Sequence, residues 1–207
     1  MTKNNDVKSM LKDAGILFAI TLIAGLVLGF VYELTKEPIR LQQELAIQRA
    51  CQEVYADASS FEATDYVPGD VVQSDLDGLG VEIGTVFKAK DASGNTIGYV
   101  VESTSKEGYG GNITIYAGIT ANTGTLNGIS ILSIAETPGL GMNAESVLVP
   151  QFENVPATMF DYTKSGSTAP NEIDAISGAT ITTDAVCKAV NGAVYVVLVD
   201  FLMKGGN

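Results

Sequence analysis

The sequence predicts an α+β protein, with a single N-terminal transmembrane helix followed by an antiparallel-sheet domain with flanking helices. Three observations predict this architecture. An uncharged apolar run lies near the N-terminus, short β-type segments separated by turn residues fill the middle, and an apolar helical pattern closes the chain. We therefore expect a tail and membrane anchor in residues 1–34, a helical stalk and connector in residues 35–80, and the sheet domain in residues 81–207.

The anchor is the run AGILFAITLIAGLVLGFVY from Ala14 to Tyr32, which contains no charged residue. As a helix it would be about 28 Å long, close to the thickness of the hydrocarbon core of a bilayer. A buried core helix would keep a polar stripe, and this run is apolar all round. A cleaved signal peptide would end in small residues, whereas Val31-Tyr32-Glu33-Leu34 follows here. These features predict one retained membrane helix.

The charges flanking this run leave its orientation open. Three basic residues precede it and three follow closely, namely Lys3, Lys8, Lys12, Lys36, Arg40 and Arg49. The positive-inside rule counts such residues and gives acidic ones little weight. The count is a tie, so charge alone does not predict which side of the membrane the domain occupies.

Composition excludes several classes of function. The chain has 24 acidic and 12 basic residues, of which 22 and 9 lie from residue 33 onward, so the domain is too acidic for nucleic acid. There is no histidine, which removes catalysis by Ser-His-Asp or Cys-His groups and His-liganded zinc. Cys51 and Cys187 are too few for a Cys-only metal site. We expect two unpaired, buried thiols, although the sequence does not decide against a disulfide between them.

The segment after the anchor predicts a stalk helix and then an irregular connector. Pro38 suits the first turn of a helix. Residues 39–54 repeat apolar side chains at three- and four-residue steps, as an amphipathic helix does. Residues 57–79 contain proline and several glycines and predict irregular structure.

The middle of the chain predicts four strands and two turns. The strands are expected at residues 83–89, 96–102, 112–119 and 128–134, with turns at 92–95 and 122–124. Residues 143–152 predict a short helix. Residues 184–203 are apolar and long enough to span a bilayer, but the interspersed Lys188, Asn191 and Asp200 favour a packed helix over a second span.

Three glycine-rich motifs are the candidate functional segments. They are GYGG at residues 108–111, ETPGLG at residues 136–141 and DAISGAT at residues 174–180. The first places Tyr109 between glycines, where it could stack on a flat ring or simply fill a turn. The second contains a proline and two glycines and predicts a tight loop.

The third motif points to a phosphate site. Gly178 and Ala179 allow another molecule to approach the backbone closely, and Thr180 supplies a hydroxyl. Helix-capping residue types follow, so Thr180 is expected at the N-terminus of the last helix, where free N–H groups favour a phosphate. Two alternatives stay open: an ordinary turn that starts a helix, or a threonine nucleophile served by a lysine or carboxylate base. In so acidic a domain, a covalent link would retain a phosphate-bearing cofactor regardless of affinity.

The order of these motifs before a C-terminal helix resembles the FMN-binding domain of the G subunits of Rnf electron-transport complexes. In that family the G subunit is the flavin subunit of the ion-translocating ferredoxin:NAD⁺ oxidoreductase. The C subunit of the Na⁺-translocating NADH:quinone reductase is similar and longer. The resemblance extends from the anchor and its exit sequence LTKEPI to Met203, and the compact chain favours the Rnf family.

The resemblance implies an electron-carrier subunit with FMN joined to Thr180 by a phosphoester bond, installed by a flavin transferase that uses FAD. The implied cofactor-binding residues are Thr180, Asp174, Ser177, Gly178, Ala179, Glu136, Thr137, Gly139, Leu140, Gly141, Tyr109 and Gly110. No metal ligand and no complete catalytic site are expected in this chain alone. Many relatives carry a histidine where this chain has Ile134.

The resemblance also implies partners and a location. The partners are other membrane subunits of the Rnf complex, the transferase during maturation, and the membrane through one helix. The domain would face the extracytoplasmic side of the cell membrane, with the N-terminal tail in the cytoplasm. Two alternatives remain, the C subunit of the quinone reductase and a non-redox, membrane-tethered assembly module.

Overall fold

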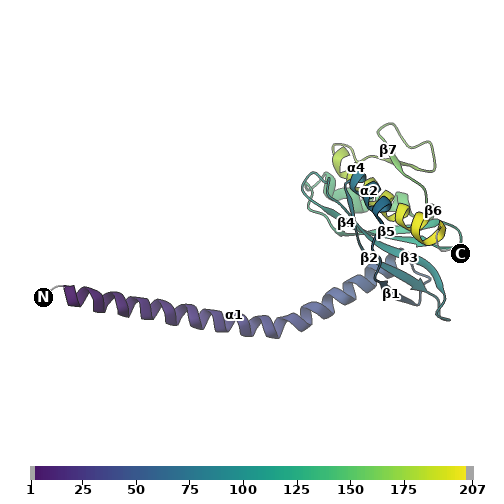
Figure 1. Ribbon diagram of the computed structural model, residues 1–207. Coiled ribbons are helices and arrows are strands. Elements are labelled where there is room, and N and C mark those ends of the chain that lie inside the picture. Colours follow the sequence, from purple (N-terminus) through teal and green to yellow (C-terminus); the bar gives the residue numbers. More distant parts are fainter. Residues whose placement is uncertain (1–2, 204–207) are drawn as a thin grey trace. The chain divides into compact units, whose positions relative to one another are not determined.

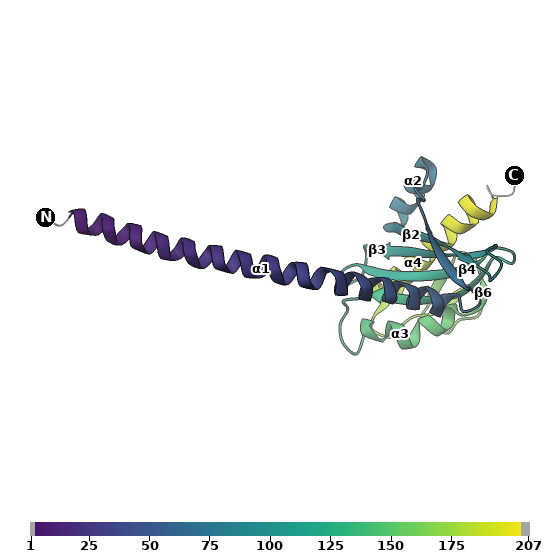
Figure 2. The same ribbon diagram turned by 90° about the horizontal axis from the view of Figure 1, so that it is seen from below.

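The computed structural model describes residues 3–203, with side chains from Met10 onward except that of Gln43 (Figure 1). The chain divides into two compact units, residues 1–47 and residues 48–207. The second unit holds all the described strands and every described helix after α1 (Figure 2). The sequence-based boundaries after residues 34 and 80 stay a prediction.

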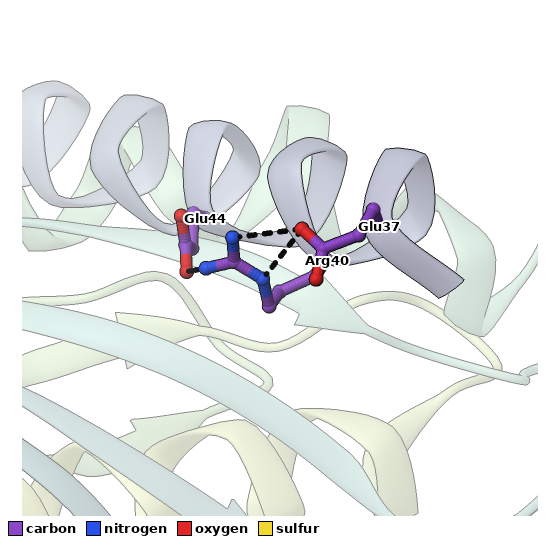
Figure 3. A network of polar contacts seen from close by, with 3 residues as sticks. All are labelled: Glu37, Arg40 and Glu44. Atoms are coloured by element: carbon purple, nitrogen blue, oxygen red, sulfur yellow. Dashed lines mark hydrogen bonds and ion pairs between the residues drawn. The ribbon is translucent and has the colours of Figure 1, made fainter. Parts of the chain in front are cut away.

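Helix α1, Lys3–Val54, is one continuous helix of 52 residues that contains the predicted anchor (Figure 1). The helical prediction for residues 39–54 is confirmed, but the expectation that a new helix begins at Pro38 is wrong, because Pro38 lies inside α1. Proline removes one backbone hydrogen bond. One ion pair spans the proline and a second follows it: Arg40 Nη2 lies 3.0 Å from Glu37 Oε2, and Arg40 Nη1 lies 2.6 Å from Glu44 Oε1 (Figure 3). Pairs at this spacing support a helix.

Two helical segments are apolar and long enough to cross a membrane. The most apolar window within Met10–Val54 has a mean hydropathy of 2.6 and none of it is buried. In Thr180–Met203 the corresponding value is 1.7, and 56% of that window is buried inside the protein. The second segment is therefore a packed helix of the domain, as its interspersed polar residues predict.

The main sheet has six antiparallel strands in the order β1-β2-β3-β4-β5-β6. They are β1 Ser60–Thr64, β2 Val81–Lys90, β3 Thr96–Ser105, β4 Ile113–Thr120, β5 Thr125–Ser133 and β6 Val155–Pro156. Strands β7 Asp161–Thr163 and β8 Glu172–Asp174 form a small parallel sheet. The four predicted strands are confirmed as β2 to β5, with hairpin turns at both predicted places.

The prediction that residues 57–79 are irregular is wrong. This segment forms β1, which pairs with the edge of β2, and helix α2, Asp70–Leu79. Helix α2 buries Val72 and Leu76 and ends at Gly80, whose φ of 69° is the left-handed conformation typical of a helix C-terminus. Gly69 and Gly80 therefore flank the two ends of a helix.

Helix α4, Thr180–Val196, covers one face of the main sheet and continues into the π-helical turn η3, Val197–Met203 (Figure 1). Val101, Ala117 and Ile115 point to this face and are fully buried with the helix. The hydroxyl of Ser103 donates a hydrogen bond of 2.7 Å to the carbonyl of Ala189 and joins strand to helix.

The opposite face of the sheet is covered by the last turn of α1, which belongs to the second unit. Val54 and Tyr55 lie against Gly118 and Gly98, where an added Cβ would meet their atoms at 2.2 and 2.4 Å. The hydroxyl of Tyr55 donates a hydrogen bond of 2.7 Å to the carbonyl of Ile97. The sheet is thus enclosed between two helical segments.

The short helix predicted at residues 143–152 is a series of three helical turns. These are η1 Gly141–Asn143, α3 Ala144–Val147 and η2 Val149–Phe152. Pro150 lies at the start of η2 and cannot continue the hydrogen bonding of a preceding helix. Phe152 is fully buried and anchors this segment to the core.

Candidate functional site

The turn before α4 exposes the N-terminus of that helix. Gly178 has a φ of 78°, and the helix begins at Thr180 after Ala179. No side chain caps this end. Because the first N–H groups of a helix have no intrahelical acceptor, they are free to bind an anion, which the helix dipole also favours.

A second loop lies beside this turn. The N–H groups of Leu140 and Met142 donate to the carbonyl oxygen of Thr137 at 3.1 and 3.3 Å, and Gly139 in this loop has a φ of 77°. An added Cβ at Gly141 would lie 2.5 Å from the hydroxyl oxygen of Thr182. The glycine therefore allows this loop to lie directly against α4.

The third glycine-rich segment is joined to the second through a carboxylate. Gly110 N–H donates a hydrogen bond of 3.2 Å to Glu136 Oε1, and the Glu136 residue is buried. An added Cβ at Gly110 would lie 1.9 Å from the carbonyl oxygen of Ala135, so only glycine fits there. Next to it, the Tyr109 residue is 71% exposed, which leaves its ring available to cover a ligand.

These three segments enclose one cavity of about 540 Å³. It is lined by Tyr109, Glu136, Thr137, Leu140, Gly141, Gly178, Ala179, Thr180, Ile181 and Thr182. Eight of these ten residues are among those the sequence predicts. Ile181 and Thr182 were missed, although their place directly after the predicted attachment residue could have indicated them.

Four predicted residues do not line the cavity: Gly110, Gly139, Asp174 and Ser177. The two glycines shape the loops beside it. Asp174 lies in β8, where its N–H donates to Gln151 Oε1 at 2.7 Å and its Oδ1 accepts from the N–H of Ser167 at 2.5 Å. Ser177 is exposed in the turn before α4. A role for either in recognition by a transferase stays a prediction.

Helix α4 also carries a lysine, Lys188, whose charge is paired. Lys188 contacts the carboxylates of Glu107 and Asp184, and these pairs raise its pKa, the hydrogen bond to Glu107 contributing most. The residues that line the cavity include no lysine or arginine, so the N–H groups at the start of α4 are the clearest anion-binding feature of the lining.

Comparison with known proteins decides which family this arrangement represents. A family model described as an FMN-binding domain matches residues 108–195, and one described as the RnfG N-terminal region matches residues 1–54. The G subunit of the Na(+)-translocating ferredoxin:NAD(+) oxidoreductase complex of Acetobacterium woodii is 35% identical, over 92% of this chain and 93% of that protein. The chain belongs to the RnfG family.

Other members of the RnfG family match over similar lengths. The G subunit of the ion-translocating oxidoreductase complex of Methanosarcina acetivorans is 32% identical, over 92% of this chain and 95% of that protein.

Among solved structures, the chain is also similar to the C subunit of the Na(+)-translocating NADH-quinone reductase from Parabacteroides distasonis. That structure is 22% identical, with a TM-score of 0.48 over 68% of this chain and 76% of that one.

The lining has the chemistry that FMN requires. The N-terminus of α4 suits a phosphate. Leu140 and Ile181 are partly exposed apolar side chains, and Tyr109 adds an aromatic ring, which together suit a flat ring system. A cavity of about 540 Å³ lies within the usual range for cofactor sites.

Proposed function

We propose that this chain is the electron-carrying G subunit of a membrane-bound, ion-translocating ferredoxin:NAD⁺ oxidoreductase, with FMN attached covalently to Thr180. One observation carries the proposal: the three glycine-rich segments meet at a cavity in which Thr180 is the first residue of a helix whose N-terminus is open. A hydroxyl at this position lies beside the N–H groups that would hold the phosphate.

The attachment step would be a phosphoryl transfer from FAD, carried out by a flavin transferase. The Thr180 oxygen forms a bond to the phosphorus nearest the flavin, the bond from that phosphorus to the bridging oxygen breaks, and AMP leaves. The hydroxyl proton passes to a base of the transferase or to solvent. The chain itself offers no histidine for this purpose.

Bound FMN would supply one- and two-electron redox chemistry, and the chain supplies position and surroundings. The N–H groups at the start of α4 would hold the phosphate, and Leu140, Ile181 and Tyr109 would flank the ring. Glu136 places a buried carboxylate against the cavity. The other membrane subunits of the complex would deliver and accept the electrons.

The remaining parts of the proposal concern location. Helix α1 would anchor the chain as a single membrane span, with the FMN domain on the extracytoplasmic side. A cofactor lost outside the cytoplasm could not be replaced, and a covalent bond would prevent that loss. The match of residues 1–54 to the RnfG N-terminal region favours the Rnf complex over the related quinone reductase.

The decisive experiment compares covalent flavin in the full chain and in Thr180→Val, each produced with a flavin transferase. The wild-type protein should fluoresce on a denaturing gel and gain the mass of one FMN less one water, and Thr180→Val should do neither. Thr123→Val, in an exposed hairpin turn, is the matched control and should be modified normally. A wild-type protein without added mass, or a Thr180→Val protein with it, would contradict the attachment.

A further inference from the structure

The hydroxyl of Thr183 closes the turn that precedes α4. It accepts a hydrogen bond of 3.1 Å from the N–H of Ile176 and donates one of 3.1 Å to the carbonyl of Ala179. The Thr183 residue is fully buried and does not line the cavity. Its hydroxyl therefore holds both ends of the turn 176–179 without touching the space in which a ligand would bind.

Two backbone hydrogen bonds also stabilise this turn. Ala179 N–H donates to the carbonyl of Ile176 at 3.0 Å, and Thr183 N–H donates to the carbonyl of Ala179 at 3.0 Å. Within the turn, Gly178 adopts its left-handed conformation and lies close to Leu140. The peptide group that leads into Thr180 is thus fixed relative to the helix axis by a side chain three residues further on.

We propose that Thr183 is the positioning residue for modification of Thr180, and that its hydroxyl sets the rate at which the transferase joins FMN to the chain. The inference rests on the proposed attachment at Thr180. Without the Thr183 hydroxyl, the Ile176 N–H would lose its acceptor and the turn would no longer be held at that end. The Thr180 oxygen would then occupy its reactive position for only part of the time.

The experiment measures the initial rate of flavin incorporation into the full chain, purified in detergent, with excess FAD and a flavin transferase. Thr183→Val keeps the shape of the side chain and removes the hydroxyl, and Thr183→Ser keeps the hydroxyl. Because small misplacements of a reacting group are costly, we expect Thr183→Val to lower kcat about 10-fold or more, with KM for the acceptor protein little changed. Thr183→Ser should restore most of the rate.

Ser103→Ala is the matched structural control. Ser103 is also a fully buried hydroxyl, and it also donates to a backbone carbonyl of α4, but far along the helix from the turn. If Thr183 acted only through general stability, the two variants would lower the rate in proportion to their loss of thermal stability. The proposal expects Ser103→Ala to be modified at the wild-type rate.

The outcomes separate this inference from the proposed function. Modification of Thr183→Val at the wild-type rate, or equal losses in Thr183→Val and Ser103→Ala, overturns the positioning role and leaves the attachment intact. A wild-type chain that takes up no flavin overturns the attachment itself. Should Thr183→Val not fold, Thr183→Ala tests the same hydroxyl, with Thr183→Ser again as the variant that keeps it.

Discussion

Cys51 and Cys187 are buried on opposite faces of the main sheet and are unpaired, as the sequence predicts. Burial raises the pKa of each thiol to about 12, and nearby carboxylates add to the shift, Glu102 for Cys51 and Asp184 for Cys187. The thiolate is the reactive form of cysteine. We therefore expect both thiols to be unreactive in the folded protein.

At the residue scale we predict that neither thiol reacts with Ellman's reagent in the native protein at pH 8. Both should react at once in urea, which is the control for reagent and concentration. Because the folded pKa lies above the unfolded value, the contribution of the thiols to stability is fully present below about pH 9 and is lost as the pH rises towards 12. Rapid reaction of a native thiol would contradict their burial.

At the scale of elements, the end of α1 is held on the sheet by close backbone approach. Gly118 and Gly128 are cross-strand partners on β4 and β5, yet an added Cβ would lie 2.2 Å from the carbonyl of Val54 at Gly118 and would meet nothing within 4 Å at Gly128. Only the first glycine is therefore required by packing.

We predict that Gly118→Ala lowers the free energy of unfolding by about 2 kcal/mol or more, because the helix end must move away from the sheet. Gly128→Ala is the matched control and should change it little. Urea unfolding of the full chain in mild detergent, followed by tyrosine fluorescence, measures both. Equal effects of the two substitutions would show that the end of α1 does not pack on β4.

A second contact between elements joins α4 to the chain before β7. The side chain of Asn191 is buried, accepts a hydrogen bond of 2.7 Å from the N–H of Phe160 and donates one of 2.8 Å to its carbonyl. The Asn191 amide thus satisfies both backbone groups of Phe160, as a neighbouring strand would.

Asn191→Ala should lower the free energy of unfolding by about 2–4 kcal/mol, because two buried backbone groups lose their partners. Asn112→Ala, at an exposed position, should stay within about 0.5 kcal/mol of the wild type. The same urea titration measures both variants. A small effect at Asn191 would mean that water or another group replaces the amide.

At the scale of the whole molecule, the two units differ in the exposure of their apolar side chains. The apolar side chains of α1 from Ile16 to Tyr32 are exposed, as a bilayer requires, whereas those of the second unit are gathered around the main sheet. This division supports the proposal that the first unit is the anchor and the second the cofactor domain.

The proposed topology predicts that alkaline phosphatase fused after residue 207 is active in cells, and that green fluorescent protein fused there is dark. Active phosphatase requires export, so this result would place the domain outside the cytoplasm. The same fusions to a chain lacking residues 1–34 are the control and should give the reverse pattern. A bright fluorescent fusion to the full chain would reverse the proposed orientation.

The sequence by itself determined the uncharged apolar helix near the N-terminus, the four central strands, the packed last helix and the glycine-rich turn before it. Each of these depends on a local signal: an uncharged run, alternation between turns, or a glycine-rich turn before capping residues. Eight of the ten residues that line the cavity were implied by the resemblance that the three glycine-rich motifs carry.

Only the tertiary structure decided the rest. Strand β1 forms because it pairs with the free edge of β2. Helix α2 forms because Leu76 packs against Val81 and Val196. The continuity of α1 through Pro38 and the closure of the turn before Thr180 by Thr183 were likewise visible only in three dimensions. Pairing and burial are free energies of contact between distant segments, and no window of sequence contains both partners.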